Sequence, residues 1–145
     1  MLGSLPYLYK TGRLRSATIF ATSPVGKLGA QSLFEFVVQK KQNGPFDSYS
    51  LDDVEAVFNM VQLVSYDERK RIKVHDTELI VSAIPSGHSI GGAVWKIEIN
   101  KCNVFYALDL NDEALKITQA LNLDKFLNAN LFITNGYLNY NKEGR

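Results

Sequence analysis

The chain contains few of the residues that form cross-links or bind metals, with one cysteine and two histidines among 145 residues. A single cysteine, Cys102, cannot form a disulfide within the chain, which favours a reducing compartment such as the cytosol or nucleus. No run of about 18 apolar residues occurs, and the first residues lack the pattern of a signal peptide. The net charge is only +1, so the field of the whole molecule does not attract nucleic acid or acidic membranes. We therefore expect an intracellular, soluble chain with no membrane partner.

The spacing of apolar residues predicts an α/β fold, with a strand and two helices followed by a mostly antiparallel, mixed sheet with helices on one face. A strand is expected at 19–21, and Ser23-Pro24 begins a helix that runs to about Lys40. Ser50 and Asp53 resemble a capping box, and the apolar stripe of that second helix runs to Val61. Further elements are expected as strands at 71–74, 79–84, 93–99, 104–108 and 131–134 and a helix at 112–121.

No internal repeat, low-complexity tract or linker divides the chain. We expect residues 1–145 to form part of one domain. Residues 3–8 are typical of the middle of a helix, and the strand at 131–134 runs into 139–142 without a further strand to pair with. Because a partial domain exposes apolar sheet surface, we expect the chain to self-associate at least in part.

One histidine and one aspartate lie where predicted strands end. His88 is in a glycine-rich loop, and Asp109 follows the strand at 104–108. If the hairpin turn between the last two long strands is centred near Lys101, Asp109 lies opposite Ala93 and both side chains reach the same sheet edge. An imidazole and a carboxylate are suitable zinc ligands. His88 and Asp109 are therefore the candidate metal ligands, and the sequence suggests no catalytic or cofactor-binding residue.

Two simpler roles remain open for this pair. A lone loop histidine is more often a hydrogen-bonded structural residue, and an aspartate at a strand end more often caps the next helix. Zinc usually takes three or four protein ligands. The second histidine, His75, is expected about 25 Å from His88, at the far end of the strand at 79–84. On spacing alone, the chain does not contain a complete metal centre.

Other motifs are weaker. The segment from Asp109 resembles a calcium loop, but Ala114 and Ala120 replace its required glycine and glutamate. The glycine-rich loop at 87–92 lacks the Lys-Ser/Thr of a phosphate-binding loop. The basic cluster at 68–73 either contacts RNA phosphates or is a solvated strand edge whose charges block further pairing.

Four segments resemble motifs of the metallo-β-lactamase fold, and within it the RNA-processing branch that carries an inserted β-CASP domain: 3–6, 87–92, 106–111 and 131–134. The resemblance implies part of an αββα sandwich, without the upstream metal motif and the downstream insertion. Three stretches are more similar to the non-catalytic, hundred-kilodalton class of subunit of the pre-mRNA cleavage and polyadenylation machinery than to its nuclease class: 23–29, 50–58 and 85–97.

The resemblance implies a non-catalytic, nuclease-like subunit of the pre-mRNA 3′-end cleavage and polyadenylation complex in the nucleus. Its implied partners are the catalytic paralogue nuclease and scaffold subunits, with pre-mRNA as a further contact. His88 and Asp109 match two ligand positions of the family, whereas the His-x-His-x-Asp-His motif is absent from the chain and Asn135 stands where catalytic relatives carry an acidic residue. No cofactor is expected, and zinc would bind only if upstream ligands exist.

The alternative is an active, zinc-dependent RNA endonuclease whose main ligands lie before Met1. In that case His88 would bind one ion and Asp109 would bridge two. A small-molecule hydrolase of the same fold is a third alternative, with less support because the best-matching stretches belong to the RNA-processing branch.

Overall fold

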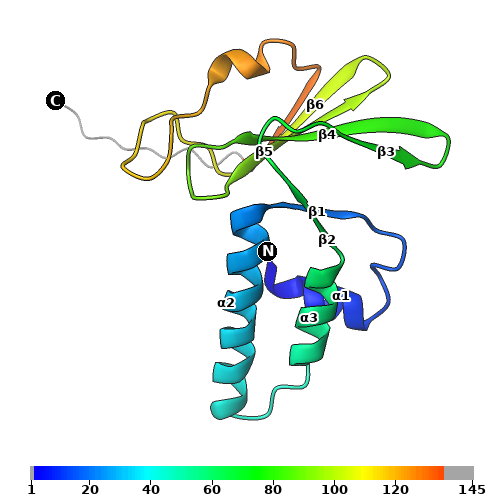
Figure 1. Ribbon diagram of the computed structural model, residues 1–145, viewed down its shortest axis with the longest axis vertical. Helices are drawn as coiled ribbons and strands as arrows, with labels where there is room; N and C mark the ends of the chain where they lie inside the picture. The colour runs from blue at the N-terminus through cyan, green and yellow to red at the C-terminus, as the bar shows by residue number, and fades with distance from the viewer. Residues whose placement is uncertain (1, 136–145) are drawn as a thin grey trace. The chain divides into compact units, whose positions relative to one another are not determined.

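The computed structural model describes residues 2–135 of the chain. They fall into two compact units, Met1–Ser65 and Tyr66–Arg145. The long helices belong to the first unit and the antiparallel strands to the second (Figure 1). The expectation that the strand at 131–134 runs into 139–142 without a further strand to pair with concerns residues that lie outside the described range.

The first unit combines helices with a small parallel sheet. A short 3₁₀ turn, η1 (Leu2–Ser4), leads into α1 (Leu5–Lys10). Residues 3–8 are helical, but the expectation that they form the middle of a helix was wrong, because α1 begins at Leu5 after its N-cap residue Ser4. The two longer helices are α2 (Ser23–Gln42) and α3 (Leu51–Asn59). β1 (Ile19–Thr22) pairs in parallel with β2 (Val61–Val64).

The predicted capping box at the start of α3 is confirmed. The Ser50 hydroxyl accepts a hydrogen bond from the Asp53 backbone N–H at 3.1 Å, and the Asp53 carboxylate accepts one from the Ser50 N–H at 2.8 Å. The predicted end of this helix was wrong, because α3 stops at Asn59 and Val61 begins β2. In a strand of only four residues, the alternation of apolar and polar side chains is too short to distinguish the strand from the end of an amphipathic helix.

The core of the first unit lies between α2, α3 and the segment that joins them. Leu33 and Val37 are one helical turn apart on α2 and pack with Tyr49 and Val54. Val37 and Val54 are completely buried. This spacing of four residues is the helical periodicity from which α2 was predicted.

The second unit contains the five-stranded sheet, in the order β3-β4-β5-β6-β7. The first four strands form an antiparallel meander and β7 is parallel to β6, so the predicted mixed, mostly antiparallel sheet is confirmed. Its strands are β3 (Lys70–Val74), β4 (Thr77–Pro85), β5 (Ala93–Ile99), β6 (Cys102–Ala107) and β7 (Leu131–Thr134).

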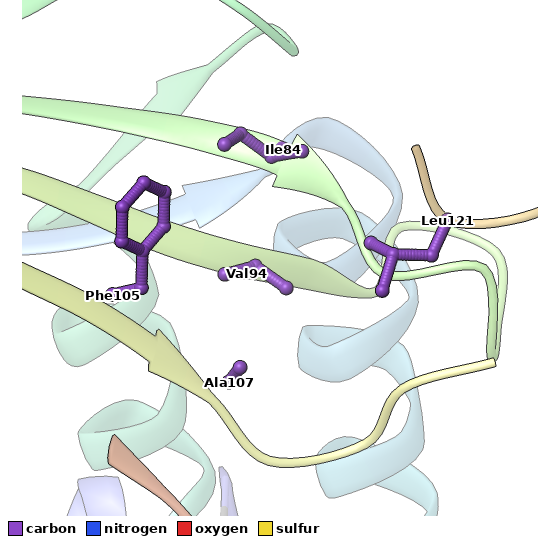
Figure 2. Close-up of a cluster of buried hydrophobic side chains, with 5 residues drawn as sticks. All are labelled: Ile84, Val94, Phe105, Ala107 and Leu121. Atoms are coloured by element: carbon purple, nitrogen blue, oxygen red, sulfur yellow. The ribbon is translucent and has the colours of Figure 1, made fainter. Parts of the chain in front are cut away.

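One face of this sheet carries the second core. Its buried side chains come from β4, β5, β6 and the segment after β6 (Figure 2): Ile84, Val94, Phe105, Ala107 and Leu121. Phe105 is 1% exposed and makes an edge contact with Phe126, at 5.0 Å between ring centroids. This cluster fixes the carboxyl ends of β4 and β6, the two strands that precede His88 and Asp109.

The predicted helix at 112–121 was wrong. This segment is irregular, and a short 3₁₀ turn, η2 (Leu123–Phe126), follows it instead. Hydrogen bonds from Asn111 and Thr118 go to the loop after β4, and Leu121 enters the core. These tertiary contacts override the local helical pattern. Within residues 2–135, no helix has the length and apolar character needed to cross a membrane.

Candidate functional site

His88 lies in a tight loop that joins β4 to β5. Pro85 pairs with Ala93 where the two strands end. Beyond this pair, the Ser86 N–H donates to the Gly92 carbonyl at 3.1 Å, and the Gly92 N–H donates to the Ser89 carbonyl at 2.9 Å. His88 is therefore at the exposed tip of a loop that its own backbone hydrogen bonds close.

Asp109 lies next to this loop because the segment that follows β6 pairs with the loop. An antiparallel bridge joins Gly87 to Leu110, and the Asn111 N–H donates to the Ser86 carbonyl at 3.0 Å. In an antiparallel register, the next positions along the two segments are His88 and Asp109. The expectation that both residues lie at the same edge of the sheet is confirmed, and both side chains are exposed.

The predicted register of the hairpin was wrong by one residue. Trp95 pairs with Tyr106, so continuing that register would place Leu108, not Asp109, opposite Ala93. The cause is a two-residue turn at Asn100-Lys101, in which both residues have positive φ, 47° and 70°. Such a turn is centred between these residues rather than on the second of them.

Gly87 anchors the loop immediately before His88. Its carbonyl accepts hydrogen bonds from the Thr118 hydroxyl at 2.7 Å and from the Asn111 side-chain amide at 3.3 Å. Gly87 has φ +76°, and a Cβ atom there would clash with the Asn111 carbonyl oxygen and lie 2.9 Å from the Leu121 nitrogen. Only glycine fits this close approach of two backbones.

Tyr66 holds the other end of the loop. Its hydroxyl donates to the Gly92 carbonyl at 3.0 Å. A tyrosine hydroxyl is protonated at physiological pH, and burial raises the pKa of the Tyr66 hydroxyl further above its ordinary value. Sequence reasoning missed Tyr66, Asn111 and Thr118, because contacts across 24 to 31 residues leave no periodic signal.

The residues present do not make a zinc site by themselves. His88 and Asp109 supply one imidazole and one carboxylate, and within residues 2–135 no group of three or more His, Cys, Asp or Glu side chains is arranged to hold a metal ion. His75 lies in the turn between β3 and β4, as expected, and the nine residues of β4 separate it from the His88 loop. A zinc ion at this edge would need further ligands from outside the described residues.

The simpler role for Asp109 also finds no support, because the helix that it would cap does not form. For His88, the described contacts involve the backbone: its N–H donates to the Ser86 hydroxyl at 3.4 Å. The loop therefore positions the His88 backbone and leaves the imidazole at the surface.

The basic cluster at 68–73 falls on and beside β3, an edge strand of the sheet. Arg69 forms an ion pair with Glu98 at 2.8 Å, Lys70 with Glu68 at 2.6 Å, and Arg71 with Glu78 at 3.4 Å. These charges on an edge strand disfavour pairing with a further strand, which supports the solvated-edge interpretation.

The chain matches the family model described as "Metallo-beta-lactamase superfamily domain" over residues 1–133. It is 32% identical over 136 residues to the cleavage and polyadenylation specificity factor subunit 2 of Oryza sativa subsp. japonica. It is also 32% identical over 138 residues to the probable cleavage and polyadenylation specificity factor subunit 2 of Drosophila melanogaster. Cleavage factor two protein 2 of Schizosaccharomyces pombe is 26% identical over 137 residues.

These matches cover nearly all of the chain but only a small part of each relative. Each covers 94% of the chain, whereas the chain spans only 16–18% of the length of these three proteins. The resemblance of 23–29, 50–58 and 85–97 to the hundred-kilodalton subunit class agrees with the subunit named in the rice and fly proteins.

Proposed function

Because the chain belongs to the metallo-β-lactamase superfamily, we propose that it is part of a non-catalytic, nuclease-like subunit of the pre-mRNA 3′-end cleavage and polyadenylation complex. The observation that carries this proposal is the match across 94% of the chain to proteins named as subunit 2 of the cleavage and polyadenylation specificity factor. The subunit would act in the nucleus through protein contacts. Its partners would be the catalytic paralogue nuclease and the scaffold subunits of that complex.

Residues 2–135 do not by themselves hold a catalytic zinc centre. The resemblance matches two exposed candidate ligands, His88 and Asp109, to ligand positions of the family, and within residues 2–135 no group of three or more His, Cys, Asp or Glu side chains could hold a metal ion. A hydrolytic zinc centre requires three protein ligands and an open position for water. We therefore derive no catalytic step from these residues.

The test uses the full-length protein that carries this chain, purified through an affinity tag from its own cells. We expect subunits of the cleavage and polyadenylation complex to co-purify with it. After dissociation from them, elemental analysis should find no stoichiometric zinc, and the protein should leave a polyadenylation-site RNA uncut. Absence of these subunits from a well-folded preparation would contradict the proposed complex.

The Asp109→Ala variant separates the proposal from the zinc-dependent endonuclease alternative. If the protein is a structural subunit, the variant should co-purify with the same subunits and the cleavage activity of the complex should be unchanged. About two zinc ions per chain, with zinc-dependent cleavage that Asp109→Ala abolishes, would establish the endonuclease instead.

A further inference from the structure

The positive charge of the first unit is concentrated near its start. The first acidic residue of the chain is Glu35, so the 34 residues before it contain no Asp or Glu and four cations. Three of these cations, Lys10, Arg13 and Arg15, lie within 7–15, together with Tyr7 and Tyr9. We call residues 7–15 the α1 exit segment.

Backbone hydrogen bonds give the α1 exit segment a defined shape. The Arg13 N–H donates to the Leu8 carbonyl at 3.0 Å and the Gly12 N–H to the Tyr9 carbonyl at 2.9 Å. With φ +73° at Gly12, these two bonds form a Schellman motif, the common glycine-dependent end of a helix. The Thr11 hydroxyl adds a third bond, to the Tyr7 carbonyl at 2.9 Å. The turn therefore fixes where the chain leaves α1.

The side chain of Arg15 lies over this turn, and both arginines and both tyrosines are exposed. The Arg15 guanidinium folds back over Gly12, where a Cβ atom would lie 3.2 Å from Arg15 Nε. Arg13 and Arg15 are exposed, and Tyr7 and Tyr9 are 48% and 36% exposed. Exposed cations beside exposed aromatic rings are the combination with which proteins bind single-stranded nucleic acid.

The cations of this segment have no acidic partners, in contrast to those on β3. Within residues 2–135, no carboxylate lies within ion-pair distance of Lys10, Arg13 or Arg15, whereas the three cations at 69–71 each pair with a glutamate. Lys10 donates to the Asp47 backbone carbonyl at 2.7 Å, which leaves its charge unneutralised. A helix C-terminus favours nearby cations, but this accounts for neither the missing carboxylates nor the exposed tyrosines.

We propose that the α1 exit segment is a binding surface for single-stranded RNA. Arg13 and Arg15 contact backbone phosphates, and Tyr7 and Tyr9 stack on bases. The inference extends the proposed function, and rests on it, by adding an RNA contact, which it assigns to 7–15 instead of the ion-paired cluster at 68–73. RNA binding at this surface depends on cations that have no acidic residues near them in the sequence, and not on the small net charge of the whole chain.

The test measures binding of a fluorescein-labelled oligouridylate to the chain by fluorescence anisotropy across a series of salt concentrations. The double variant Arg13→Ala/Arg15→Ala is compared with Arg69→Ala/Arg71→Ala, which removes the same charge from the cluster at 68–73. We expect the first pair to weaken binding and to lower the salt slope by about 1.4, since each phosphate contact on single strands contributes about 0.7. The second pair should change both quantities much less. Circular dichroism verifies that each variant is folded.

Base stacking is tested at Tyr7. Tyr7→Ala should weaken oligouridylate binding about fivefold or more, whereas Tyr7→Phe, which keeps the ring, should bind as the parent does. Equal losses for the two arginine pairs, or no loss for Tyr7→Ala, would overturn the proposal. Competition by oligoglutamate as strong as that by oligouridylate would assign the surface to acidic peptides instead.

This result is independent of the test of the proposed function. A chain that co-purifies with the cleavage and polyadenylation subunits but binds no RNA through 7–15 overturns only the surface assigned here. If the chain binds RNA through 7–15 but the full-length protein does not co-purify with those subunits, the assignment to the complex is overturned and the RNA surface stays in place.

Discussion

At the scale of single residues, Gly87 controls the position of the loop that carries His88. Its carbonyl accepts two side-chain hydrogen bonds, and its Cα faces the backbone of Asn111 and Leu121. The same hydrogen bonds explain why 112–121 is not helical, because Asn111 and Thr118 are used to hold the loop. One glycine thus links the geometry of the candidate site to the path of the chain after β6.

Substituting this glycine should be costly. In Gly87→Ala, the new methyl group collides with backbone atoms while φ remains at +76°, and we expect a loss of about 3 kcal/mol or more in the free energy of unfolding. The matched control is Gly3→Ala, since no atom lies within 4 Å of a Cβ at Gly3, and its effect should stay within about 0.5 kcal/mol. Urea denaturation followed by circular dichroism measures both. Equal midpoints for the two variants would refute the close approach at Gly87.

At the scale of the elements, α3 depends on its capping box. Two reciprocal hydrogen bonds between Ser50 and Asp53 satisfy backbone donors that a nine-residue helix would otherwise leave unpaired. Val54 and Val57, both completely buried, lie directly after this cap. The start of α3 is therefore fixed at the place where the helix enters the core of its unit.

Ser50→Ala removes the side-chain acceptor of the cap and should lower stability by about 1 kcal/mol. Ser48→Ala, two residues earlier at an exposed position, is the control and should have almost no effect. Thermal unfolding of both variants gives the comparison. A loss at Ser48 as large as that at Ser50 would show that the cap has no specific role.

The two edge strands of the second unit differ in how they are protected. β3 carries lysine and arginine, whereas β7 is uncharged and its residues are all exposed. Leu131, Phe132 and Ile133 are 52%, 41% and 42% exposed. An uncharged, apolar edge can pair with the same edge of a second copy without placing like charges opposite each other, and charged edges resist such pairing.

The expected self-association of the chain should therefore proceed through β7. We predict a dimer in light scattering at high concentration, and Leu131→Lys/Ile133→Lys should convert it to a monomer. Ile90→Lys, at a residue 55% exposed in the loop between β4 and β5, should leave the dimer unchanged. A parent chain that stays monomeric at all concentrations contradicts this prediction.

At the scale of the whole molecule, ligands and charges are distributed unevenly. His88 and Asp109 lie together at one end of the sheet, and the other histidine, His75, lies beyond β4 at its other end. The three cations of the α1 exit segment, Lys10, Arg13 and Arg15, belong to the first unit, and none of them takes part in an ion pair among the described residues. The candidate RNA surface thus belongs to the first unit and the incomplete metal edge to the second.

We predict that the chain alone, after dialysis, retains far less than one zinc ion per molecule. Two ligands give too few bonds to offset removal of water from the ion, and structural or catalytic zinc sites use three or four. Elemental analysis of the parent and of His88→Ala should give the same low zinc content. One bound zinc that His88→Ala removes would instead show that the missing ligands are supplied by the chain itself.

The sequence by itself determined the features that depend on local order. Turn residues, the Ser50–Asp53 cap and the alternation of apolar side chains predicted α2, the start of α3 and the five strands of the sheet, and motif resemblance predicted the family. Each of these signals lies within a short stretch of the chain, where helical or strand periodicity acts directly on neighbouring residues.

Only the tertiary structure decided the features that depend on distant contacts. The parallel pairing of β2 with β1, the irregular path of 112–121 and the bridge from Gly87 to Leu110 all join segments at least 20 residues apart. Such contacts are selected by backbone hydrogen bonds and burial in three dimensions, which no local period of the sequence encodes.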